Sequence, residues 1–150
     1  MEPLPFVDEH VCPVAASPER TWDALVAIVS GGAREVPGPL AAAWGLEHPS
    51  RSGDWDGPAP GSTVAGFAVA EADRPRALTL RGGHRFSRYE ARFTLVPASD
   101  GRTELHARTD AAFPGLPGTV YRTLVIGSGG HALVVKGLLA RVARRAERTA

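Results

Sequence analysis

Residues Val120–Val142 read VYRTLVIGSGGHALVVKGLLARV, and they set the arrangement of the C-terminal third of the chain. Apolar side chains recur at helical spacing on both sides of a run of small residues, Gly127-Ser128-Gly129-Gly130, and His131 falls on the same face. The apolar members of this stripe are Val120, Leu124, Val135, Leu138 and Val142. Small residues and one imidazole on the buried face of a long helix leave volume and supply a polar group. The pattern therefore predicts a cavity beneath the helix. It leaves open whether the small residues form a kink or separate two helices.

Four segments before this helix alternate in the way typical of strands: residues 62–71, 76–86, 89–97 and 102–112. Short turn signals separate them, so we expect an antiparallel meander. Gly82-Gly83 is a hairpin signal, but a turn there would leave half of segment 62–71 without a partner. We therefore place the turn at residues 86–88, which makes Gly82 and His84 face inward.

The turn at residues 97–101 sets the register of the last two strands. If it pairs Val96 with Arg102, Glu90 lies opposite Arg108 on the outer face, and opposite charges across a ladder favour that pairing. The same register places Tyr89 opposite Thr109 on the inner face.

The N-terminal third predicts one strand and two short helices. Residues 6–14 alternate loosely and read as a strand. Ser17-Pro18 then begins a helix, with Ser17 as the N-cap, and Gly31-Gly32 ends it. Residues 31–61 are rich in Gly and Pro around a short element near residues 40–47 that contains Trp44.

The stretch from Val14 to Leu25, VAASPERTWDAL, combines small residues, a Pro, an acidic residue and a Trp at the start of the first helix. With the element order described above, it resembles the START-like superfamily, which includes polyketide cyclase/dehydrase proteins, lipid-transport proteins and the helix-grip fold of birch-pollen-allergen type. The resemblance covers residues 1–150 as one domain. It implies an α+β helix-grip fold, in which a curved antiparallel sheet wraps around a long C-terminal helix, with two short helices after strand 1 and an apolar cavity between sheet and helix. The chain lacks the glycine-rich loop motif of the plant members, and its C-terminal helix is interrupted.

Composition excludes several classes of function. The 150 residues carry 17 basic and 16 acidic side chains, a net charge of +1, which gives no field strong enough to predict nucleic-acid binding. Only the C-terminal arginines form a local basic patch, which fits a solvated helix end or docking to an acidic membrane or partner. One cysteine, Cys12, excludes an intrachain disulfide. We find no signal peptide and no integral membrane segment, and expect a cytoplasmic protein.

Cofactor, metal and catalytic motifs are absent from the sequence. Gly127-Ser128-Gly129-Gly130 follows no strand and has no neighbouring Lys-Ser/Thr, so it is no phosphate loop, and we expect no cofactor. His10 and Cys12 share a strand face, but no second pair accompanies them, and we expect no metal.

Eight residues are candidates for contact with a ligand, because each combines an expected inward position with an aromatic, imidazole or apolar side chain. They are Trp44, Phe67, His84, Tyr89, Tyr121, Leu124, His131 and Val135. Each also fits ordinary core packing. No acidic residue lies on the helical face of His131, so we expect Tyr89 and Thr109 of the sheet as its polar neighbours.

Three hypotheses of function remain open at this point. The first is binding of a hydrophobic small molecule or lipid in the cavity. The second is a polyketide cyclase/dehydratase-like enzyme that uses His84 or His131 as a general acid or base. The third is a protein-interaction module with a collapsed pocket. The sequence does not reveal the ligand or the oligomeric state.

Overall fold

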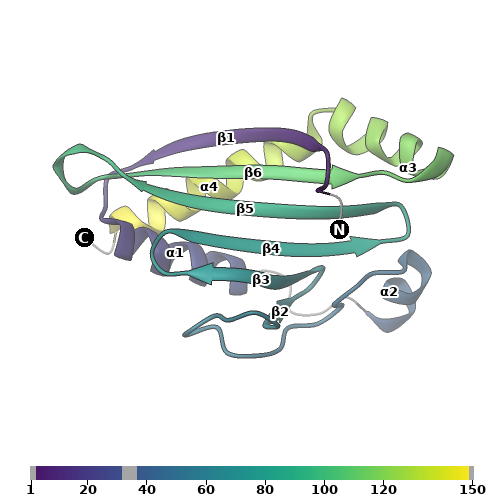
Figure 1. The fold of residues 1–150 in the computed structure, drawn as a ribbon, viewed down its shortest axis with the longest axis horizontal. Helices are drawn as coiled ribbons and strands as arrows, with labels where there is room; N and C mark the ends of the chain where they lie inside the picture. The colour runs from purple at the N-terminus through teal and green to yellow at the C-terminus, as the bar shows by residue number, and fades with distance from the viewer. Residues whose placement is uncertain (1–2, 32–36, 149–150) are drawn as a thin grey trace.

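The computed structural model describes residues 3–31 and 37–148, which form one antiparallel sheet with helices on one of its faces (Figure 1). The strands are β1 (Phe6–Val14), β2 (Thr63–Val64), β3 (Phe67–Asp73), β4 (Ala77–His84), β5 (Ser87–Pro97) and β6 (Thr103–Ala112). The helices are α1 (Pro18–Ser30), α2 (Gly38–Trp44), α3 (Gly115–Arg122) and α4 (Gly130–Arg148), with a 3-10 turn η1 (Ser99–Gly101) and a π-helical turn η2 (Thr123–Gly127). The six strands follow the order β1-β6-β5-β4-β3-β2. The predicted α+β class, with two short helices after the first strand and a long C-terminal helix on the sheet, is confirmed.

Helix α1 begins and ends where the sequence predicts. The side chain of Ser17 accepts a hydrogen bond from the backbone N of Arg20 at 3.3 Å, and Pro18 takes the first helical position. Trp22 and Leu25 are buried on its inner face. Gly31 caps the C-terminal end, and Gly32 lies outside the described residues.

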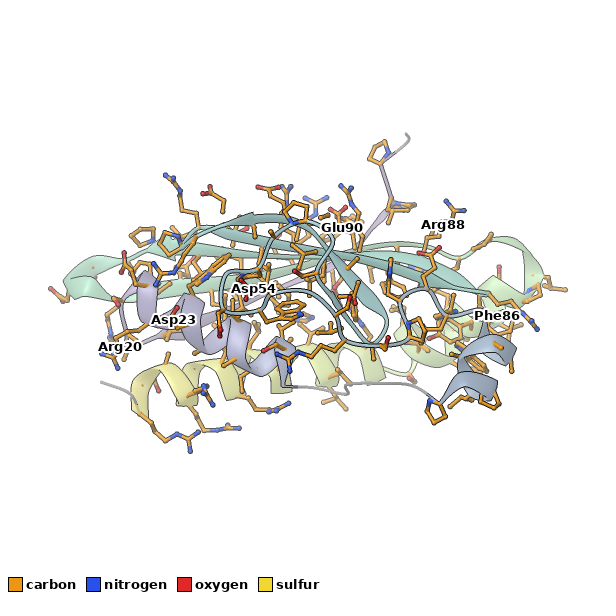
Figure 2. The ribbon with its side chains drawn as sticks, turned by 90° about the horizontal axis from the view of Figure 1, so that it is seen from below. Arg20, Asp23, Asp54, Phe86, Arg88 and Glu90 are labelled. Carbon is orange, nitrogen blue, oxygen red and sulfur yellow. The ribbon has the colours of Figure 1, made fainter. Side chains whose placement is uncertain are left out.

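The core lies where α1 and the C-terminal half of α4 cover the sheet together. Leu25 of α1, Leu105 of β6 and Val142 of α4 are fully buried there. Nη2 of Arg20 also donates a hydrogen bond to the backbone oxygen of Ala146, at 2.6 Å, and so joins the two helices. The outer face of the sheet is charged: Arg88 and Glu90 point away from the helices (Figure 2).

The hairpin between β4 and β5 turns at residues 85–86, because His84 pairs with Ser87. Gly82 therefore stays inside the strand, opposite Tyr89, as the sequence argument predicts. A Cβ atom on Gly82 would collide with the carbonyl oxygen of Gly66. Glycine serves here for the close approach of two backbones and not for a turn.

The predicted strand over residues 62–71 is divided in two. β2 ends at Val64 and β3 begins at Phe67, and Gly66 between them has a φ of +90°. Its backbone N donates a hydrogen bond to the carbonyl of His48 at 2.8 Å, so the break ties the preceding loop to the sheet.

The predicted register of β5 and β6 is wrong by two residues. Val96 pairs with Glu104 and not Arg102, and Glu90 pairs with Asp110 and not Arg108. The physical reason is a wider loop around η1. The backbone N of Ala98 donates a hydrogen bond to the carbonyl oxygen of Arg102, and Asp100 between them has a φ of +59°. A shift of two keeps every side chain on its predicted face.

The C-terminal apolar stripe is divided between two helices. α3–η2 and α4 meet at an angle of 51°, and Gly129 at the corner has a φ of +79°. The small residues therefore separate two helices. Val120 and Leu124 are exposed, which corrects the prediction that they share a buried face with Val135. The π-helical turn η2 adds a residue to the helical repeat and rotates the later side chains relative to the earlier ones.

Candidate functional site

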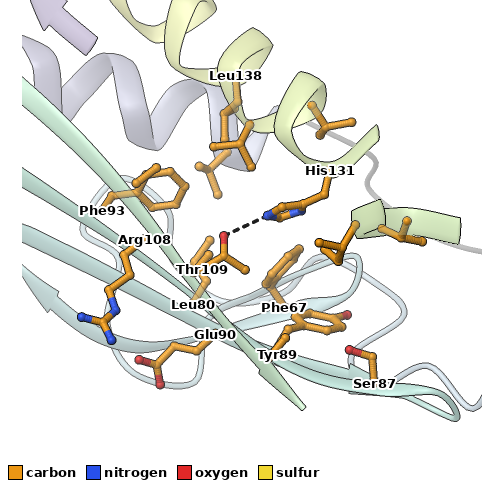
Figure 3. Close-up of a pocket in the computed structure, with 18 of the residues that line it drawn as sticks. Phe67, Leu80, Ser87, Tyr89, Glu90, Phe93, Arg108, Thr109, His131 and Leu138 are labelled. Atoms are coloured by element: carbon orange, nitrogen blue, oxygen red, sulfur yellow. Dashed lines mark hydrogen bonds between the residues drawn. The ribbon is translucent and has the colours of Figure 1, made fainter. Parts of the chain in front are cut away.

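A cavity of about 420 Å³ lies between the inner face of the sheet and the N-terminal half of α4 (Figure 3). Its walls are mostly apolar side chains of the sheet, of the last turn of α1, of η2 and of α4. They include Ile28, Val29, Val64, Leu80, Phe93, Ala107, Ala111, Phe113, Val125, Ile126, Val134 and Leu138. The lining also includes polar and charged residues, among them Glu90, Arg108 and Arg141, so the cavity is mostly but not wholly apolar.

Six of the eight candidate residues line the cavity, namely Phe67, His84, Tyr89, Tyr121, His131 and Val135. Leu124 does not, since 68% of it is exposed, and its neighbours Val125 and Ile126 take the inward position. Trp44 is also absent from the lining. The sequence argument missed the contribution of α1, whose apolar stripe continues through Ile28 and Val29.

His131 extends from the first turn of α4 toward the sheet. Its Nε2 lies 3.1 Å from Oγ1 of Thr109, as predicted for one of its two neighbours (Figure 3). Tyr89, the other expected neighbour, donates its hydroxyl proton to the carbonyl oxygen of Gly66 at 2.8 Å instead. His131 is therefore anchored to β6 and faces the cavity from the helix side.

Asp8 of β1 supplies a carboxylate that the analysis of the α4 face missed. Its Oδ1 is buried and lies 3.3 Å from Nε2 of His131, and its Oδ2 lies 3.2 Å from Nε2 of His10. Asp8 precedes His10 and Cys12 at strand spacing, so the alternation that placed those two on one face could have placed Asp8 there as well. Oδ1 makes no hydrogen bond with any described residue, so Asp8 acts on His131 through its charge alone. A negative charge beside Nε2 favours a proton on that atom, and Nδ1 of His131 is then the acceptor.

His84 faces the cavity from the β4–β5 hairpin. The backbone N of Phe86 donates a hydrogen bond to Nδ1 of His84 at 3.1 Å, so the neutral ring carries its proton on Nε2. Burial lowers the pKa of His84 below its usual value. His84 is therefore a neutral imidazole with one free donor.

Tyr89 is the most deeply buried phenol of the site. Its ring contacts Phe67 at a centroid distance of 5.0 Å. Burial, with smaller contributions from Tyr121 and Glu47, raises the pKa of Tyr89 to about 12. The phenol thus keeps its proton at neutral pH, and that proton is bonded to Gly66.

An aromatic cluster closes the cavity at the hairpin end. The rings of His84 and Tyr121 lie 4.8 Å apart, and Phe86 stacks on Tyr121 at 6.0 Å. Trp44 of α2 packs against the outside of this cluster, with its ring 6.0 Å from His84 and 5.2 Å from Phe86. Trp44 is predicted to line the cavity, but in the structure its ring lies behind the lining residues.

His10 and Cys12, weighed as half of a metal site, have other neighbours. His10 contacts Asp8, and the thiol of Cys12 donates to the carbonyl oxygen of Pro13 at 3.5 Å. Burial, followed by the charge of Glu147, raises the pKa of Cys12. Across residues 3–31 and 37–148, no group of three or more His, Cys, Asp or Glu side chains is placed to hold a metal ion.

Comparison with solved structures identifies the fold. A conserved protein from Geobacillus kaustophilus has 16% identity and a TM-score of 0.59, with 94% of this chain and 95% of that chain covered. A protein from Thermus thermophilus has 18% identity and a TM-score of 0.58, with 97% and 99% covered. A START superfamily protein from Mycobacterium smegmatis has 18% identity and a TM-score of 0.53, also with 97% and 99% covered.

The sequence itself matches no protein-family model and no curated protein. The structural similarity extends over nearly the whole chain, and the chain has the START-like helix-grip fold. The fold expected from the order of the elements and from residues 14–25 is confirmed.

Proposed function

We propose that this protein binds a lipophilic small molecule in the cavity between the sheet and α4. The observation that carries the proposal is the cavity itself. Its volume of about 420 Å³ falls in the range of about 300–1,000 Å³ found for small-molecule sites, and its walls are mostly apolar. A space of this size argues against the hypothesis of a collapsed pocket.

The polar groups in the walls define which ligands would fit. His84 offers a donor at Nε2, because its Nδ1 is bonded to the backbone of Phe86. His131 offers an acceptor at Nδ1, because its Nε2 lies between Thr109 and Asp8. The ligand we propose has an apolar body, a carbonyl or ether oxygen toward His84 and a hydroxyl toward His131.

Native mass spectrometry of the freshly purified protein tests the proposal first, because a retained ligand would appear as added mass. A titration with a fluorescent fatty acid gives the affinity. Val135→Phe should fill part of the cavity and weaken binding at least tenfold, whereas Val96→Phe, an exposed position on β5, should leave the affinity unchanged. Thermal melting of both variants verifies that they fold. Equal affinities in folded variants would contradict the proposal.

A second candidate function, a cyclase/dehydratase-like enzyme, is favoured by the carboxylate of Asp8 beside the imidazole of His131. A carboxylate orients an imidazole and stabilises its charged form, as a general base requires. Asp8→Asn should keep the affinity but stop any conversion of the ligand. If ligand released from the wild-type protein lacks one water molecule relative to ligand from Asp8→Asn, the protein is a dehydratase. Identical ligand masses would leave binding as the function.

A further inference from the structure

The helices at one end of the molecule carry a row of exposed apolar side chains, here called the apolar ridge. It consists of Leu116, Val120, Leu124, Leu133 and Val134. Leu116 is 78% exposed and Leu133 is 73% exposed, so most of each side chain faces solvent. Large contiguous apolar surface on a folded protein marks a site of contact with a partner or a membrane.

Helical spacing aligns the first three side chains of the ridge. Leu116, Val120 and Leu124 recur every four residues along α3 and η2, so they form one stripe. Leu133 and Val134 are exposed in the first turns of α4, directly after the 51° bend that ends this stripe. Figure 1 shows α3 extending past the end of β6, where the sheet does not cover it.

The ridge adjoins the cavity. Val134 is exposed on the ridge and also lines the cavity. Val125 and Ile126, directly after Leu124, line it too. Whatever covers the ridge therefore lies beside a wall of the cavity.

The charge of these helices identifies the covering partner. Between Gly115 and Arg148 the chain has six basic side chains and one acidic side chain, Glu147. Arg141, Arg144 and Arg148 lie further along α4 at intervals of three and four residues and share one exposed face, and Arg141 also belongs to the cavity lining. Apolar side chains at one end of a helical face and arginines along the rest fit an interfacial helix on an anionic lipid surface.

We propose that the apolar ridge docks on an anionic phospholipid surface, with its leucines among the acyl chains and the arginines of α4 on the phosphates. A second copy of this chain fits less well, because its matching helices would offer the arginines of α4 only one acidic side chain, Glu147. In this arrangement the ridge rests on the surface, and the cavity wall faces the lipid. No single helix within the described ranges is both long and apolar enough to cross a membrane.

Vesicle flotation tests the docking without any cavity ligand. The full chain is mixed with vesicles of phosphatidylcholine alone or of phosphatidylcholine with phosphatidylglycerol. We expect at least tenfold more bound protein on the vesicles with phosphatidylglycerol, and a decrease of that binding with rising salt. Equal or absent binding on the two kinds of vesicle overturns the proposal, and leaves cavity binding to be judged by its own titration.

Matched variants locate the contact. Leu124→Gln with Leu133→Gln should reduce vesicle binding at least tenfold, whereas Val11→Gln with Val96→Gln, also exposed but on the sheet, should not. Arg144→Gln with Arg148→Gln should remove the preference for phosphatidylglycerol, and Arg88→Gln with Arg102→Gln should preserve it. If the ridge variants instead change only the sedimentation of the free protein from dimer to monomer, the ridge is a dimer contact and the proposal is wrong.

Discussion

The two halves of α4 lie over the same sheet, yet the C-terminal half is closely packed against its neighbours and the N-terminal half covers a cavity. In the C-terminal half, Leu139, Val142 and Ala146 are buried against α1 and the sheet. In the N-terminal half, His131 and Val135 line the cavity. The difference follows the position of α1, which packs beside the first region on the sheet and reaches the second only through its last turn.

This comparison changes the explanation of the cavity that the sequence suggests. The glycines of the 127–130 run were expected to leave space above the sheet. The structure places Gly129 at a corner between helices, and Gly127 and Gly130 are not among the lining residues. The cavity forms beyond the end of α1, where only α4 covers the sheet. The glycines form the turn between α3–η2 and α4.

The strongest test of this difference between the two halves of α4 uses two adjacent leucines. Leu139 is 2% exposed in the closely packed half, and Leu138 lines the cavity. Leu139→Ala should lower the free energy of unfolding by about 2–5 kcal/mol, because it leaves a void in packed surroundings. Leu138→Ala should cost about 1 kcal/mol, since its site is already open on one side. Urea unfolding measures both, and equal losses would mean that the two halves are packed alike.

A smaller effect is expected at two adjacent glycines of β4. A methyl group on Gly82 would meet the carbonyl oxygen of Gly66 and the ring of Tyr89, whereas on Gly83 its nearest neighbour is the Ser87 oxygen at 3.3 Å. Gly82→Ala should therefore cost about 1–3 kcal/mol and disturb the cavity wall. Gly83→Ala should lower the free energy of unfolding by less, and thermal denaturation of both variants measures the difference. A Gly82→Ala variant as stable as Gly83→Ala would show that Gly66 can move away.

The smallest effects concern two histidines on opposite faces of the sheet. Burial lowers the pKa of His84 on the cavity side. Burial also acts to lower the pKa of His106 on the outer face, but hydrogen bonds with Glu9 and Glu104 outweigh it and raise the pKa. NMR titration of the two rings should therefore give midpoints on opposite sides of about 6.5.

The two shifts have opposite consequences for stability. The contribution of His106 is complete below about pH 6.5 and is lost as the pH rises through its raised pKa, whereas that of His84 is complete above about pH 6.5 and is lost as the pH falls through its lowered pKa. His106→Gln should thus be destabilising by about 0.2–1 kcal/mol at acidic pH and nearly neutral at alkaline pH. The same small loss at both pH values would mean that the carboxylates do not hold the charged ring.

Local chemistry determined the parts that the sequence predicts well. The cap at Ser17, the inward phase of His84 and the contact between His131 and Thr109 each follow from spacing within one or two elements. The parts it predicts poorly depend on distant segments. Asp8 meets His131 because β1 lies beneath α4, and Leu124 lies on the exposed stripe of α3 and η2, which a 51° bend separates from α4. The register of β5 and β6 depends on one loop conformation at Asp100.

The pairing of β1 with β6 has a consequence for how the chain folds as it is synthesised. Residues 6–14 are synthesised well before their partner residues 103–110 and the covering helix α4. The polar inward row of β1, with Asp8 and His10, thus stays exposed to water until most of the chain has left the ribosome. Such distant pairings slow folding, because loop closure must precede the contacts that repay it. The contact of Asp8 with His131 is therefore among the last features of the molecule to form.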